Sequence, residues 1–68
     1  MEKKEIKGFL KLVQSGTSDE IIFGQYPDKD LFNYLKNVRA ITVQYCEFPK
    51  GKILAIMKGP NFFKYLED

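Results

Sequence analysis

The sequence contains no histidine and only one cysteine, Cys46, and its five glycines are scattered rather than clustered. Histidine is the commonest general base and metal ligand in proteins, and scattered glycines form no loop that holds a phosphate group. A single cysteine also excludes an internal disulfide. We therefore expect no catalytic residue, no bound metal and no cofactor.

Two remaining sets of reactive side chains have ordinary structural explanations. The acidic residues Asp19, Glu20, Asp28 and Asp30 are near one another in the sequence, but they lack the regular spacing and internal glycine of a calcium loop. Cys46 needs a neighbouring base to act as a nucleophile. We interpret Asp28 and Asp30, which follow Pro27, as helix-opening residues, and Cys46 as a small strand residue.

Long apolar runs and a strong net charge are also missing. No segment approaches the about 20 apolar residues that span a bilayer, and the first residues do not resemble a signal peptide. Eleven basic and nine acidic residues give a net charge of +2, which is too small on its own to indicate nucleic-acid binding. These features predict a cytoplasmic protein that does not contact membranes.

Aromatic residues are what the sequence has in quantity. Six phenylalanines and four tyrosines make up 15% of the chain. A chain of this length buries only about 60% of its surface on folding, so a few large rings must supply much of the core. We expect residues 1–68 to form a single small α+β domain.

The first half of the chain contains two predicted strands. In Glu5–Val13, the residues Ile6, Leu10 and Leu12 share one parity, which is the period-two pattern of a half-buried strand. In Glu20–Tyr26, three apolar residues follow one another, as in a central strand that is covered on both faces. The polar residues between the two segments predict a hairpin loop.

A short helix is predicted over Lys29–Asn37. Pro27 ends the preceding segment because it has no backbone N–H, and Asp28 or Asp30 can accept hydrogen bonds from the free N–H groups at the helix start. Apolar residues one and four positions apart form a narrow stripe within the segment. A helix this short requires packing against the rest of the protein.

The second half contains a predicted hairpin and an aromatic tail. Arg39–Phe48 alternates apolar and polar residues, and Lys52–Lys58 is apolar throughout its middle. Between them, Pro49 and Gly51 predict a type I turn with a bulge. The tail, Asn61–Asp68, forms either a capped helical turn or an extended segment, and its aromatic residues predict docking in both cases.

These elements predict an α+β fold of order β-β-α-β-β, with a small, strongly coiled antiparallel sheet or a partly open barrel. Gly8 and Gly24 lie inside the first two predicted strands, where glycine permits bending, and this favours a barrel. The bent first strand and the helix between strands resemble the oligonucleotide-binding fold. That fold has five strands and its helix usually follows the third, so no site residue is carried over from it.

Two functional hypotheses follow. The preferred one is a non-catalytic protein-interaction or accessory module that binds a protein partner, or a second copy of itself, through a sheet edge or the aromatic tail. The alternative is a single-stranded nucleic-acid binder, in which Phe9 stacks on a base between Lys7 and Lys11. Lys52 and Lys58 extend this patch if the last strand lies alongside. The same residues also fit a buried Phe9 with lysines along the rim.

Overall fold

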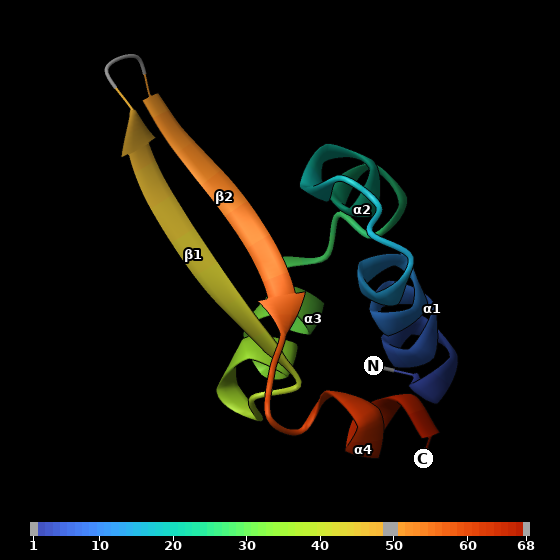
Figure 1. Cartoon of the computed structure of the whole chain (residues 1–68). Coiled ribbons are helices and arrows are strands. Elements are labelled where there is room, and N and C mark those ends of the chain that lie inside the picture. Colours follow the sequence, from blue (N-terminus) through green and yellow to red (C-terminus); the bar gives the residue numbers. More distant parts are fainter. Residues whose placement is uncertain (1, 49–50, 68) are drawn as a thin grey trace.

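The computed structural model describes residues 2–48 and 51–67, and it shows helices packed at the base and along one side of a long β-hairpin (Figure 1). In chain order the elements are α1 (Lys3–Gln14), α2 (Asp19–Gln25), α3 (Lys29–Asn37), β1 (Ile41–Phe48), β2 (Gly51–Lys58) and α4 (Phe62–Glu67). The molecule is elongated, with principal extents of 40, 23 and 21 Å. The predicted order β-β-α-β-β and the coiled sheet or partly open barrel are wrong, because the first two predicted strands are helices and the described sheet has two strands.

The segment predicted as the first strand, Glu5–Val13, lies within helix α1. The reason is a second pattern in the same residues. Ile6, Phe9, Leu10 and Val13 occupy positions i, i+3, i+4 and i+7, which places them on one side of a helix. The last three of these are buried in the core, whereas a strand would have directed Phe9 and Leu10 to opposite faces.

Gly8 is explained by close packing rather than by a bent strand. The Tyr26 hydroxyl lies against it, and a Cβ at this position would be 2.9 Å from Tyr26 Cζ. The ring of Tyr26 also packs on Phe9, with 6.1 Å between the ring centroids. Glycine at this point of α1 therefore allows the residue that follows α2 to pack closely on the helix.

The segment predicted as a central strand, Glu20–Tyr26, lies mostly in helix α2, and Tyr26 follows its end. Three consecutive apolar residues point in different directions on a helix. Ile22 is buried at 1% exposure, whereas Ile21 is 53% exposed. A short apolar run does not by itself distinguish a buried strand from a helix, and here the helix forms.

The predicted helix over Lys29–Asn37 is confirmed as α3 with those bounds. One carboxylate oxygen of Asp28 accepts hydrogen bonds from the backbone N–H groups of Asp30 and Leu31, at 2.9 and 3.3 Å. Asp28 is therefore the N-cap, one of the two residues expected in this role. Leu31 and Leu35 are fully buried, so packing supports this short helix.

Helix α3 ends in a Schellman motif that has arginine where glycine is usual. Ala40 N donates to Leu35 O at 3.0 Å and Arg39 N donates to Lys36 O at 3.2 Å. Arg39 adopts a left-handed φ of 62° to make this turn. Helix α1 ends in the same way, but there Gly16 occupies the left-handed position with a φ of 73°.

The predicted C-terminal hairpin is confirmed. Strands β1 and β2 pair antiparallel, with Ile41 opposite Lys58 at the base and Phe48 opposite Gly51 at the far end. The predicted turn and bulge involve Pro49 and Lys50, which lie outside the described residues.

The tail forms the short helix α4, so the helical interpretation of this segment is confirmed. Asn61 is the first residue of the tail and the cap that the sequence predicts for its helical turn, and its side-chain amide donates to Val38 O at 2.9 Å instead. Phe62 is fully buried, whereas Phe63 is 51% exposed. The core thus draws on all four helices and the base of the hairpin; its buried members are Phe9, Leu10, Val13, Ile22, Leu31, Leu35, Ala40, Ile41 and Phe62.

Candidate functional site

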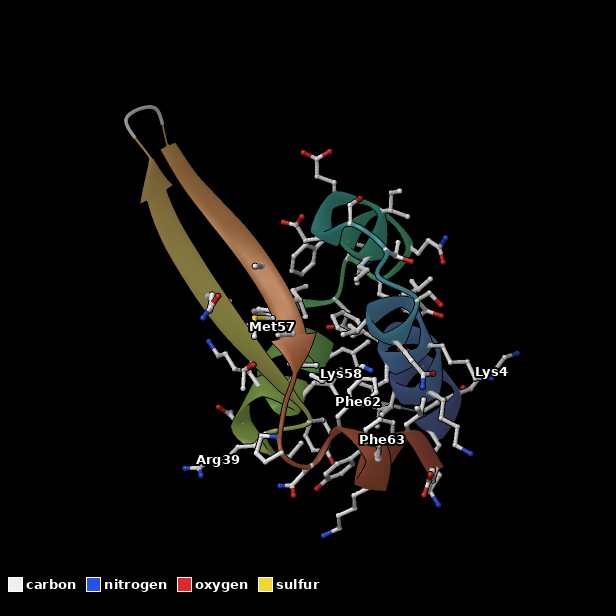
Figure 2. All side chains as sticks on the ribbon, in the orientation of Figure 1. Lys4, Arg39, Met57, Lys58, Phe62 and Phe63 are labelled. Atoms are coloured by element: carbon white, nitrogen blue, oxygen red, sulfur yellow. The ribbon has the colours of Figure 1, made fainter. Side chains whose placement is uncertain are left out.

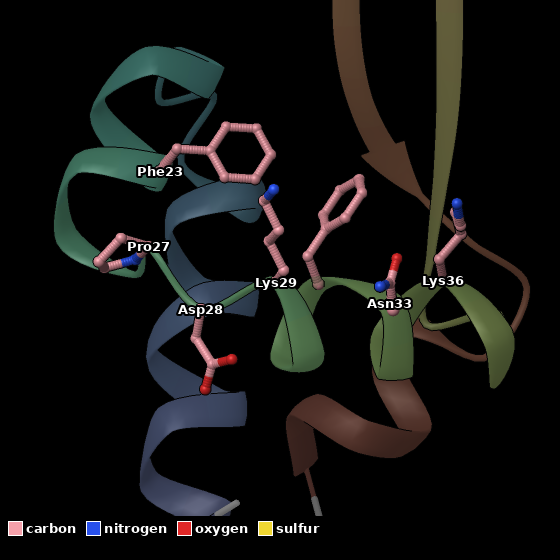
Figure 3. A pocket seen from close by; sticks show the side chains of 7 residues that line it. Phe23, Pro27, Asp28, Lys29, Asn33 and Lys36 are labelled. Atoms are coloured by element: carbon pink, nitrogen blue, oxygen red, sulfur yellow. The ribbon is translucent and has the colours of Figure 1, made fainter.

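An apolar groove with a volume of about 510 Å³ lies between α2 and α3 (Figure 3). Phe23 comes from the end of α2, Pro27 and Asp28 from the connection, and the other residues from α3. The complete lining is Phe23, Pro27, Asp28, Lys29, Phe32, Asn33 and Lys36. The groove therefore exists only because residues 19–25 form a helix beside α3.

Two aromatic rings form the apolar part of the groove. The ring centroids of Phe23 and Phe32 are 5.2 Å apart and the rings meet edge to face at 65°. Both side chains are only half-buried. Edge-to-face pairs hold their rings in a defined orientation, so the groove presents ordered aromatic surface to an incoming group.

The lysines supply positive charge beside these rings. Phe32 and Lys36 are one turn apart on α3, and the Lys36 ammonium lies 5.6 Å from the Phe32 ring centroid, within the range of a cation–π contact. Lys29 lines the other part of the groove and is exposed. Both ammonium groups can still donate hydrogen bonds to a ligand.

The only acidic residue in the lining, Asp28, has a structural role as the N-cap of α3. Its carboxylate accepts two backbone N–H groups at the start of α3, where the positive end of the helix dipole offsets its charge. Two lysines against this one capping aspartate leave an excess of positive charge. The groove is therefore suited to a ligand that combines an apolar group with negative charge.

The lining residues offer ring surface, two ammonium groups, the Asn33 amide and the Asp28 carboxylate. In the part of the chain that the structure describes, no three His, Cys, Asp or Glu side chains form a group that could hold a metal ion.

The structure separates the residues of the predicted nucleic-acid patch. Phe9 is fully buried in the core, so its ring is not available to stack on a base. Lys7 and Lys11 lie one turn apart on α1, with Lys7 half-buried and Lys11 exposed. An exposed ring between two lysines was expected because residues 7, 9 and 11 share one face of a strand, but this segment is a helix. A binding role for the two lysines remains a prediction.

Lys58 lies with the aromatic tail instead of with the lysines of α1 (Figure 2). Its ammonium is 5.7 Å from the Phe62 ring centroid and 5.4 Å from that of Phe63. Phe63 is half exposed, so this end of the molecule also presents a ring beside a cation. Lys52 is opposite Glu47 in the hairpin register, and its side chain lies outside the described part.

The groove residues were not among the predicted site residues. Phe32 belongs to the apolar stripe predicted for residues 29–37 and packs against the core, while its spacing to Lys36 is that of a surface pair on one helix face. The strand predicted over Glu20–Tyr26 contains Phe23 and does not place its ring beside Phe32, whereas helix α2 does. The spacing of Phe32 and Lys36 was the one signal in the sequence that pointed to this surface.

Comparison with known proteins finds no matching family model, no similar curated protein and no similar solved structure. Among the described residues, no helix combines the length and the apolar character needed to cross a membrane.

Proposed function

We propose that the protein is a non-catalytic protein-interaction module whose α2–α3 groove binds a short acidic segment of a partner protein. The observation that carries the proposal is the half-buried Phe23–Phe32 ring pair with Lys29 and Lys36 beside it. The rings receive an apolar anchor side chain, and the lysines contact carboxylates on either side of it. This is the groove-binding mode of peptide recognition.

The size and openness of the groove favour a peptide anchor. Its volume of about 510 Å³ falls within the about 300–1,000 Å³ of ligand pockets. However, Lys29, Asn33 and Lys36 are all exposed, whereas pockets for small molecules usually enclose most of the ligand. A side chain on a peptide needs only one face covered, because the rest of the peptide lies along the surface.

The apolar anchor and the lysines have different roles in this proposal. Exposed ion pairs contribute about 0–1 kcal/mol each, so the lysines add little affinity. They select acidic partners and speed association. Most of the binding energy comes from the anchor on the rings, as at interface hot spots. A cytoplasmic partner belongs to the proposal, since a lone cysteine is typical of a protein that folds without disulfides.

Fluorescence anisotropy with labelled short peptides tests the proposal. One peptide carries a central phenylalanine or leucine flanked by glutamates, and its control carries the same anchor flanked by lysines. We expect the acidic peptide to bind more tightly. Phe32→Ala should weaken binding by about 30-fold, which corresponds to a hot-spot loss of about 2 kcal/mol.

Charge reversal supplies a variant that leaves the core intact. Lys36→Glu should weaken the acidic peptide and strengthen the basic one, whereas Lys4→Glu, at an exposed position on α1, should change neither. Equal binding of both peptides by the native protein would contradict the proposal. Binding of a labelled oligonucleotide would also contradict the proposal, if neither peptide binds the native protein and if Lys7→Glu and Lys11→Glu abolish the oligonucleotide binding.

A further inference from the structure

The two long edges of the hairpin have different surroundings. Helices α1 and α2 both pack against β2, and in Figure 1 they lie on the β2 side of the hairpin. The main helical contact of β1 is with α3, which lies at the base. Within the described residues the sheet contains only these two strands. The backbone groups along the outer edge of β1 therefore have no strand partner there.

The charged residues of the two strands also distinguish the two edges of the hairpin. Strand β2 carries Lys52 near one end and Lys58 at the other, whereas Glu47 is the only charged residue of β1. Lysine on an edge strand is a common device against pairing with another chain. Strand β1 lacks this device and is instead rich in β-branched and aromatic residues, which favour strand pairing. Its edge is therefore the one suited to a further strand.

The hairpin also gains stability from such pairing. A two-stranded hairpin is marginal in water unless further strands or helices cover it. Ile41 is buried, and Val43 and Ile56 pack against the core, so the helices support the hairpin at its base. Its far end lies away from the helices (Figure 1). Another strand along β1 would support the hairpin over its whole length.

We propose that β1 pairs antiparallel with β1 of a second copy, which gives a four-stranded sheet across a two-fold axis. A second copy fits this edge, because β1–β1 pairing brings no two lysines together, whereas pairing through β2 brings Lys52 and Lys58 of both copies to the interface. The contact is also isologous and closes on itself as a dimer. It involves a different surface from the α2–α3 groove.

Symmetry restricts the register of this pairing. Residues opposite each other in an antiparallel pair project to the same face, and faces alternate along a strand. A two-fold axis perpendicular to the sheet keeps each side chain on its own face. One residue of β1 must therefore lie opposite the same residue of the second copy, because two consecutive residues project to different faces and cannot be opposite each other. The central residues of Ile41–Phe48 are Gln44 and Tyr45. An axis at Gln44 places Glu47 of each copy opposite Ile41 of the other, without like charges in contact.

Sedimentation of the full chain over a range of concentrations tests this proposal. We expect a concentration-dependent dimer for the native protein and a monomer for Gln44→Lys, because lysines then face each other at the axis or diagonally across it. Gln44 is exposed, so the fold tolerates this change. Met57→Lys is the matched control, since Met57 is 43% exposed and belongs to β2; this variant should remain a dimer.

A disulfide at the axis supplies a second readout. In the Gln44→Cys variant on a Cys46→Ser background, mild oxidation should produce a covalent dimer if the axis passes through residue 44, because only directly opposite cysteines lie within the about 4.4–6.8 Å Cα separation of a disulfide. If the axis passes through residue 45, Tyr45→Cys on the same background should produce the covalent dimer instead. Met57→Cys on the same background should not. A native protein that stays monomeric at its highest soluble concentration would overturn the proposal. A dimer that survives Gln44→Lys but is lost in Lys36→Glu would also overturn it, since it would place the contact in the groove.

Discussion

Substitutions at Gly24 distinguish the helix of the structure from the strand that the sequence pattern indicates. Gly24 is an exposed residue of α2, and a Cβ at this position meets no atom within 4 Å. Glycine in a helix interior is less stable than alanine by about 0.5–1 kcal/mol. Gly24→Ala should stabilise the protein by this amount, which raises the melting temperature by about 2–8 °C in a domain of this size.

Valine at the same position makes the test specific to secondary structure. In a helix, valine is less favourable than alanine by about 0.5 kcal/mol, because its branched side chain loses rotamer freedom against the preceding turn. In a strand the order is reversed, since β-branched residues are preferred there. The structure therefore predicts that Gly24→Ala melts at a higher temperature than Gly24→Val.

Thermal unfolding followed by far-UV circular dichroism measures both variants, and Gly59→Ala is the control. A Cβ on Gly59 would lie 2.9 Å from the carbonyl carbon of Arg39, and this backbone cannot move aside without disturbing the end of α3. We expect Gly59→Ala to lose about 1–3 kcal/mol, as overpacked variants do. A valine variant of Gly24 more stable than the alanine variant would refute the helical assignment.

Three further predictions concern stability and are checked by urea denaturation. Asp28→Ala should lose about 0.5–2 kcal/mol with the N-cap, while Asp28→Asn retains most of it; equal losses would exclude the capping role. Arg39→Gly should gain about 1 kcal/mol, because glycine adopts the left-handed conformation without strain; a loss would show that the arginine side chain contributes more than the strain. Phe9→Ala should lose about 3–5 kcal/mol, as expected for a buried ring, whereas an unchanged stability would contradict its burial.

The parts of the fold that were predictable have strong local signals. Pro27 followed by Asp28 indicates a helix start, and the structure shows Asp28 capping α3. The alternating apolar and polar residues in Arg39–Phe48 indicate β1, because a period of two over eight residues fits no helix. The docking of the tail followed from the large apolar area of its rings, of which Phe62 is fully buried.

The first two helices were missed because their segments carry competing patterns. Ile6, Leu10 and Leu12 satisfy a period of two, while Phe9 and Val13 complete a period of 3.6, and only the second pattern places all the buried residues of α1 on one side. Both segments contain a glycine, which favoured a bent strand. Tertiary packing decided the outcome, since α1 contacts α2, β2 and α4 in the folded protein.

The candidate site could not be predicted from the sequence for a related reason. The groove requires Phe23 on a helix beside Phe32, and a strand over residues 20–26 removes that contact. The predicted nucleic-acid patch is affected in the same way. Phe9 was expected on an exposed strand face, but in the helix it lies in the core of the molecule. Errors in local secondary structure thus propagate directly into the predicted surface.

Nuclear magnetic resonance tests the proposed binding of an acidic segment with an apolar anchor in the α2–α3 groove. Isotope-labelled protein is titrated with the glutamate-flanked peptide while the backbone amide signals are followed. We predict that the largest saturable shifts fall on residues 23–36 and disappear in Lys36→Glu. Shifts confined to α1 or to the hairpin, or no shifts at peptide excess, would contradict the claim.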